Sequence, residues 1–208
     1  MKKTLVALVA VSGVAGCLEA DQTSSAVRTP NSAGVISGST SSNSERGSDV
    51  SSVTGNTYAY AAGGIESAGL QGFAGIVSGA SVTAPPVTGS AVMTGDFEVA
   101  VLEAIFVVGD QVQASGYTDR GSLSLTADFD DRTLTGTGTG IDGGISNFYA
   151  NNNVLTVNGT FSGDELSGTV SYDGVSGPMT GLVGSNEAIG VFHGNDDHQV
   201  HAGGFIVN

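Results

Sequence analysis

Residues 122–139 read SLSLTADFDDRTLTGTGT, and they decide the fold of this chain. From Ser122 to Asp128 small polar residues alternate with apolar ones, which is the period of a strand with one buried face. Residues 130–132 (DDR) form a turn, after which threonine alternates with leucine or glycine up to Thr139. The stretch therefore predicts two paired strands, with hydroxyl groups facing water and glycines leaving space inside for large neighbours.

The same alternation extends outward from this pair and predicts an all-β fold. Connections between the segments are short, so neighbouring strands should pair antiparallel. Eight such strands can close into an up-and-down β-barrel, filled by its own side chains or holding one small ligand. A membrane-spanning barrel is disfavoured, because the outward residues are Thr and Ser rather than an apolar band. The predicted barrel covers residues 95–208, with strands near 97–108, 122–129, 133–139, 153–161, 165–172, 177–184, 188–194 and 200–207.

Residues 57–94 have a less regular pattern, with the segments TYAYAA, LQGFAGIVSG and SAVMTG. They predict a short β-strand region that forms a small subdomain or packs against the base of the barrel.

The N-terminus has the pattern of a lipoprotein signal peptide over residues 1–16. Lys2 and Lys3 precede an apolar run at residues 4–11, and residues 14–17 (VAGC) resemble the bacterial lipobox. Cys17 is the only cysteine, and acylation would explain a lone thiol in an exported protein. An ordinary signal peptide followed by a chance cysteine is the alternative. The chain has no run of 18 apolar residues that would predict a spanning helix.

Residues 17–56 predict a disordered tether. This segment is rich in Ser, Thr and Gly and has no aromatic residue, so it cannot bury enough apolar surface to fold alone. A flexible chain of this length typically reaches about 35 Å, enough to lift a domain off a membrane.

The charge balance excludes some partner classes. The chain has 6 Lys and Arg against 20 Asp and Glu, a net charge of −14. Removal of the signal peptide leaves four arginines against 20 carboxylates, a net charge of −16. Nucleic acid and anionic membrane surfaces need clustered cations and are disfavoured as partners. The acidity serves either solubility or the attraction of a basic partner.

Three segments together resemble the β-barrel domain of transferrin-binding protein B. Residues 123–136 resemble its hairpin of the form apolar-x-V-D-F-x-x-K-T-V-x-G, and residues 158–163 (NGTFSG) resemble its F-S-G element. Residues 188–194 (AIGVFHG), followed by residues 202–205 (AGGF), are similar to its closing hairpin. The matches cover about residues 120–208 and occur in the order of the family.

The resemblance implies a surface lipoprotein of Gram-negative bacteria with a filled eight-stranded barrel. Members of this family bind host proteins such as transferrin, lactoferrin or complement regulators, or bind haem. This chain departs from the family in having one barrel and, in residues 57–94, at most a remnant of the family's handle domain. His193 replaces the usual Tyr of the closing hairpin. Transferrin binding itself is therefore not carried over.

The three histidines all fall in the closing hairpin, at His193, His198 and His201. Two imidazoles brought together across a hairpin could ligate haem iron or a metal ion. The alternative is one His that replaces an aromatic residue of the wall and two solvated loop histidines. The acidic turns at 128–131 and 196–197 lack the pattern of a calcium loop, and local turn hydrogen bonds suffice to explain them. No metal site is expected.

Aromatic residues divide into barrel filling and candidate contacts. Those at strand positions, such as Phe97 and Phe161, should fill the barrel. Tyr117, Phe148 and Tyr149 fall in the two longest predicted barrel loops and are the first choice for a protein-binding face.

The sequence as a whole predicts a non-catalytic lipoprotein, since no catalytic motif occurs in it. We expect a monomer anchored in the outer membrane by acylated Cys17, a site of palmitate attachment, on the cell surface or the periplasmic face. Leu18 after the cysteine favours the outer membrane. Its function would be to bind a host or environmental protein, or haem, in iron acquisition. The alternative is a structural envelope lipoprotein without a dedicated ligand.

Overall fold

The computed structural model describes residues 45–65, 69–108, 111–141 and 153–208. All regular elements in these ranges are strands. No helix in them is long and apolar enough to cross a membrane. The strands are β1 (Glu45–Val50), β2 (Thr57–Ile65), β3 (Gly69–Ile76), β4 (Ser90–Val108), β5 (Gln111–Asp128), β6 (Thr133–Ile141), β7 (Val154–Ser162), β8 (Glu165–Tyr172), β9 (Val175–Val183), β10 (Ala188–Asn195) and β11 (Gln199–Val207).

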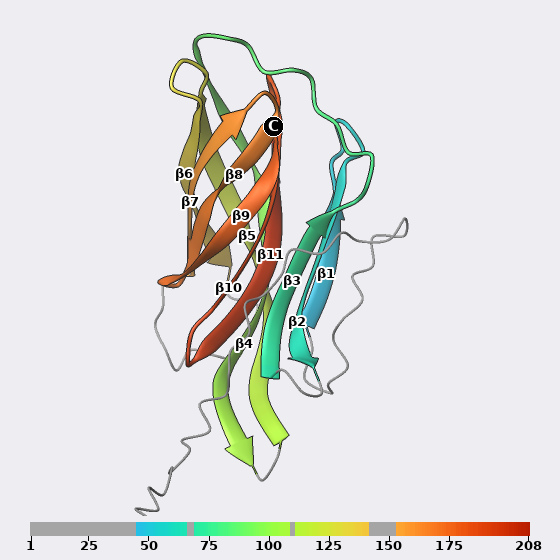
Figure 1. Cartoon of the computed structure of the whole chain (residues 1–208), viewed down its shortest axis with the longest axis vertical. Helices are drawn as coiled ribbons and strands as arrows, with labels where there is room; N and C mark the ends of the chain where they lie inside the picture. Colours follow the sequence, from blue (N-terminus) through green and yellow to red (C-terminus); the bar gives the residue numbers. More distant parts are fainter. Residues whose placement is uncertain (1–44, 66–68, 109–110, 142–152) are drawn as a thin grey trace, which may run out of the picture.

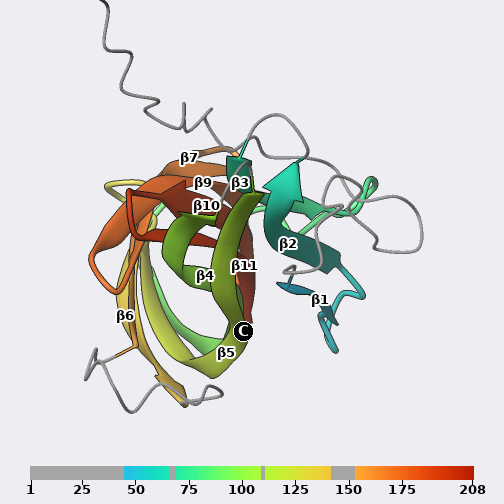
Figure 2. The same cartoon turned by 90° about the horizontal axis from the view of Figure 1, so that it is seen from below.

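Strands β4 to β11 form a closed antiparallel barrel (Figure 1). Each pairs with its neighbour in sequence, and β11 closes the ring by pairing with β4. Figure 2, from below, shows the strands as a ring with the remaining three outside it. The eight-stranded barrel predicted from the alternating pattern is confirmed.

The first two barrel strands are longer than predicted. β4 begins at Ser90, so the segment SAVMTG belongs to the barrel and not to the region before residue 95. Residues 111–121, predicted as a loop, form the first half of β5. Gly116 and Gly121 interrupt the apolar alternation here, which hides the strand in the sequence.

The barrel interior is filled by side chains of its own strands. Phe97, Phe129 and Phe161 lie in this core, with Phe192 and Phe205 from the closing hairpin. The prediction that the strand phenylalanines fill the barrel is confirmed for these five; the side chain of Phe106 lies outside the described residues. The other large core members are Met93, Leu123, Leu125, Leu134, Leu155, Leu166, Tyr172 and Met179.

A separate three-stranded sheet, in the order β1-β2-β3, packs on the outside of the barrel (Figure 1). Tyr58 and Tyr60 of β2 and Leu70 of β3 share a buried apolar cluster with barrel residues such as Ile189 and Val191. This small sheet therefore covers an apolar outer face on β4, β10 and β11.

The strand β1 shows that the predicted tether extends too far along the chain. Glu45–Val50 pairs with β2 over its whole length, so the tether predicted for residues 17–56 is wrong from Glu45 onward. The side chains that alternate inward are Glu45, Gly47 and Asp49, none of them apolar. Gly47 lies against the Tyr60 ring, where a Cβ would collide with the phenol oxygen. The rest of the tether and the signal peptide, Cys17 included, lie outside the described residues.

Candidate functional site

One end of the barrel carries a hairpin that extends beyond the other strands. β11 pairs with β4 only as far as Glu103, and β6 pairs with β5 only from Arg120. Beyond these points β4 and β5 pair with each other as far as Val108 and Gln111, past an irregularity between Glu103 and Phe106. Figure 1 shows both strands running below the ring. We call the described residues 104–108 and 111–119 the projecting hairpin.

A buried carboxylate lies where the projecting hairpin joins the barrel. Asp119 is fully buried, and the Tyr172 hydroxyl donates a hydrogen bond of 2.7 Å to its Oδ2. The backbone N–H of Arg120 donates to Oδ1 at 2.8 Å. Gly140 leaves the space for this carboxylate, because a Cβ there would collide with Oδ2. Burial raises the pKa of the Tyr172 phenol, and the hydrogen bond to the Asp119 carboxylate raises it further. The phenol therefore stays protonated and can donate this hydrogen bond.

The same end of the barrel is acidic. Burial raises the pKa of the Glu103 carboxyl group, and the negative charge of Asp173 raises it further. Burial raises the pKa of the Tyr117 phenol, and the nearby carboxylates of Glu103 and Asp173 raise it further. The Arg120 side chain does not neutralise this end, because it forms an ion pair with Glu98 on the outside of the barrel.

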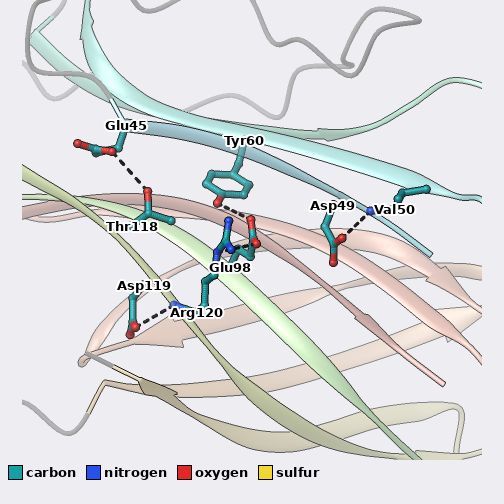
Figure 3. Close-up of polar contacts among 8 residues, drawn as sticks. All are labelled: Glu45, Asp49, Val50, Tyr60, Glu98, Thr118, Asp119 and Arg120. Atoms are coloured by element: carbon teal, nitrogen blue, oxygen red, sulfur yellow. Dashed lines mark hydrogen bonds and ion pairs between the residues drawn. The ribbon is translucent and has the colours of Figure 1, made fainter. Parts of the chain in front are cut away.

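That ion pair belongs to a polar junction between the small sheet and the barrel (Figure 3). Glu98 accepts a hydrogen bond of 2.8 Å from the Tyr60 hydroxyl and lies 2.8 Å from Arg120 Nε. Close by, the Thr118 hydroxyl donates to Glu45 at 3.4 Å. Sequence reasoning missed this junction. The available signal was Glu98, a lone carboxylate in the apolar run of residues 97–102.

The structure describes only one of the three aromatic residues predicted for a protein-binding face. Tyr117 lies in β5, half-buried, so its predicted position in a loop is wrong. Its side chain nevertheless lies at the base of the projecting hairpin, where it packs against the barrel core. Phe148 and Tyr149 lie outside the described residues.

The histidines are not brought together as ligands. His201 faces the barrel interior, with its ring 5.9 Å from that of Tyr172 and 6.0 Å from that of Phe192. His193 pairs with Ala202, and both alternate onto the outer face covered by the small sheet. His198 is exposed in the turn between β10 and β11. The barrel wall therefore separates the two buried imidazoles.

The acidic turns use their carboxylates locally. Asp128 Oδ1 accepts hydrogen bonds of 3.0 Å from the N–H groups of Asp130 and Asp131. Asp196 Oδ1 likewise accepts from His198 and Gln199, both at 2.8 Å. Among the described residues, no group of three His, Cys, Asp or Glu side chains is arranged to hold a metal ion.

Two open grooves lie on the described surface, away from the projecting hairpin. One, of about 470 Å³, is lined by residues of β7, β8 and β9 such as Phe161, Glu165 and Thr180. The other, of about 300 Å³, lies between β3 and β9, with Ile76 and Leu182 in its walls. Neither is lined by a residue that the sequence suggested for binding.

Comparisons with known proteins give structural matches alone. No family model and no curated protein matches the chain. The chain is similar to the haemoglobin receptor HpuA from Kingella denitrificans, with a TM-score of 0.36 and 18% identity over 74% of this chain and 63% of that one. HpuA in complex with human haemoglobin matches with a TM-score of 0.33 and 19% identity, over 74% of this chain and 55% of that one.

Intact Ap-TbpB, with its N and C lobes, matches with a TM-score of 0.40 and 16% identity, over 82% of this chain and 39% of that one. It carries the name of the family that the sequence motifs resemble. The chain spans less than two thirds of the length of each of these three structures.

Proposed function

We propose that this chain is a non-catalytic binding protein of the bacterial cell envelope, which captures a protein partner at the end of the barrel that carries the projecting hairpin. The observation that carries the proposal is a filled barrel with one hairpin extended beyond it. A filled barrel leaves no lumen for a small ligand, so recognition takes place on the outside. An extended hairpin with a tyrosine at its base offers a surface suited to another protein.

The proposal includes a lipid anchor at Cys17 in the outer membrane. Its support is the lipobox-like VAGC at residues 14–17. Two or three acyl chains hold a protein on a bilayer nearly permanently. Labelled palmitate should enter the wild-type chain and not the Cys17→Ser variant, which should appear in the soluble fraction. A variant that stays with the membrane would contradict the anchor.

Haem capture is not favoured as a second function. A pair of histidine ligands is absent from the described hairpin, because His193 and His201 lie on opposite faces of the barrel wall. A role in iron acquisition would therefore come through a protein partner.

A capture experiment tests the proposed function. The mature chain, a variant with residues 104–116 replaced by a short Gly-Asn turn, and Thr137→Arg would each be immobilised and exposed to host and environmental protein extracts. Thr137 is exposed on β6 outside the projecting hairpin, which makes its variant the matched surface control. A partner held by wild type and Thr137→Arg but lost with the shortened hairpin supports the proposal. Capture that survives the shortening would contradict binding at the projecting hairpin. No capture in any extract would favour the structural envelope lipoprotein without a dedicated ligand.

A further inference from the structure

The polar junction carries more negative than positive charge. β1 turns Glu45 and Asp49 inward, where both are half-buried, and Glu98 of β4 is buried between the small sheet and the barrel. Figure 3 shows Glu98 and Arg120 between the other two carboxylates. Arg120 pairs with Glu98, and within the described ranges neither Glu45 nor Asp49 has an ion-pair partner. Two of the three negative charges therefore lack a cation from this part of the chain.

A buried hydroxyl without a hydrogen-bond partner lies in the same junction. The Tyr58 ring lies against Gly204 of β11, which pairs with Glu98 of β4. Burial raises the pKa of the Tyr58 phenol, and the negative charges of Glu98 and Asp49 raise it further, so the hydroxyl lies near both carboxylates. Tyr58 is fully buried, yet its oxygen has no hydrogen-bond partner among the residues that the structure describes. Buried polar atoms normally have one, and an N–H donor from outside these residues would serve this oxygen and the carboxylates alike.

The junction is open to solvent beside the projecting hairpin. Glu45 and Asp49 form its half-buried rim, and Tyr58 and Glu98 form its floor. Gly116 of the projecting hairpin is exposed and leaves space at the rim, because a Cβ there would lie 3.0 Å from Glu45 Cγ. A cationic group can therefore approach from the side on which we place the partner.

We propose that the polar junction binds an extended basic segment of the protein partner, with arginine side chains that pair with Glu45 and Asp49. The inference rests on the proposed capture of a protein and adds the chemistry of that partner. Glu45 and Asp49 lie four residues apart in β1, about 13 Å, which is also the spacing of residues i and i+4 in another extended chain. A guanidinium fits better than an ammonium, because its five N–H donors can serve a carboxylate and the Tyr58 oxygen together.

Other sources of positive charge fit less well. Within the described residues no group of three His, Cys, Asp or Glu side chains is arranged for a metal ion. The described arginines besides Arg120 lie elsewhere, since Arg46 is on the opposite face of β1 and Arg132 is in the turn between β5 and β6. Nucleic acid and anionic lipid would be repelled by the uncompensated carboxylates.

Fluorescence anisotropy of a labelled peptide on the full mature chain tests the proposal. The probe carries two arginines four positions apart in a Ser/Thr spacer, and a second probe has neutral citrulline in both positions. We expect the arginine probe to bind about tenfold more tightly than the citrulline probe. Glu45→Gln/Asp49→Asn should weaken its binding about tenfold, and Tyr58→Phe about threefold. Asp131→Asn/Glu165→Gln removes the same charge from exposed residues at the other end of the barrel and should bind as wild type does.

Equal affinity of wild type for the two probes would overturn the proposal. Equal weakening by the junction variant and the control variant would overturn it too, because the attraction would then come from the net charge of the whole chain. Both results would leave the proposed function standing, since capture by the projecting hairpin is measured separately with the partner itself.

Discussion

The pairing of Tyr172 with Asp119 is the clearest single-residue contribution to stability at the candidate site. A fully buried carboxylate needs its hydrogen bonds, and Tyr172→Phe removes the one at 2.7 Å. We predict that this variant loses about 2 kcal/mol of unfolding free energy, the usual cost of leaving a buried acceptor unsatisfied. Urea denaturation monitored by circular dichroism measures the loss.

Tyr58→Phe is the matched control for that measurement. The Tyr58 hydroxyl is also buried, but it has no hydrogen-bond partner within the part of the chain that the structure describes. Its removal should leave the unfolding free energy unchanged or slightly higher. Equal losses in the two variants would show that the hydroxyl of Tyr172 contributes only packing.

The buried histidines predict a loss of stability in mild acid. Burial lowers the pKa of His193 from 6.5 to about 4 and that of His201 from 6.5 to about 3. Because the folded pKa values lie below the unfolded one, the unfolded chain takes up protons first as the pH falls. Stability is thus highest above pH 6.5, and between pH 6.5 and 5 each group costs about 2 kcal/mol.

Unfolding free energies of wild type and His201→Gln over this pH range test the effect. The variant should show a shallower pH dependence, whatever its stability at pH 7. His198→Gln removes an exposed histidine and should keep the wild-type slope. A His201→Gln slope as steep as that of wild type would contradict the prediction.

At the scale of elements, the small sheet depends on its polar junction with the barrel. Tyr60 and Glu98 form a buried hydrogen bond, whereas the Arg120 side chain that pairs with Glu98 is 71% exposed. We predict that Tyr60→Phe costs about 1–2 kcal/mol, because Glu98 loses its phenol donor. Arg120→Ala should cost under about 1 kcal/mol, with a loss that shrinks in high salt. Urea denaturation at low and high salt checks both, and a larger loss from Arg120→Ala would contradict this ranking.

The elements also show what a sequence pattern can and cannot predict. Strands β6 to β11 were predictable to within two residues, because turn residues separate them and each is either an alternating segment, as in β7, or a short apolar run, as in β10 and β11. β1 was not, since its inward positions carry Glu45, Gly47 and Asp49 and its pairing depends on the backbone. The alternation of the strand predicts that His193 and Val191 lie on the same face of β10. That this face is buried could not be predicted, because the small sheet that covers it is distant in sequence.

On the scale of the whole molecule, the small sheet makes the barrel surface compatible with a monomer. Beneath it, β4, β10 and β11 carry apolar residues on the outside of the barrel, among them Ile189, Val191, Val200 and Ile206. An uncovered apolar patch of this kind normally finds a partner. We therefore expect the full chain to be a monomer with this patch covered.

Deletion of residues 45–76 should turn the monomer into a dimer or larger species, because the patch is then exposed. Light scattering after size exclusion, together with binding of a hydrophobic dye, measures this for the full and shortened chains at one concentration. Adding Val191→Ser and Ile206→Thr to the shortened chain should restore a monomer, because these changes make the exposed patch polar. If the shortened chain stays monomeric and binds no dye, the small sheet is not what keeps the barrel soluble. The contacts of the small sheet with β10 and β11 would then serve only to orient the small sheet.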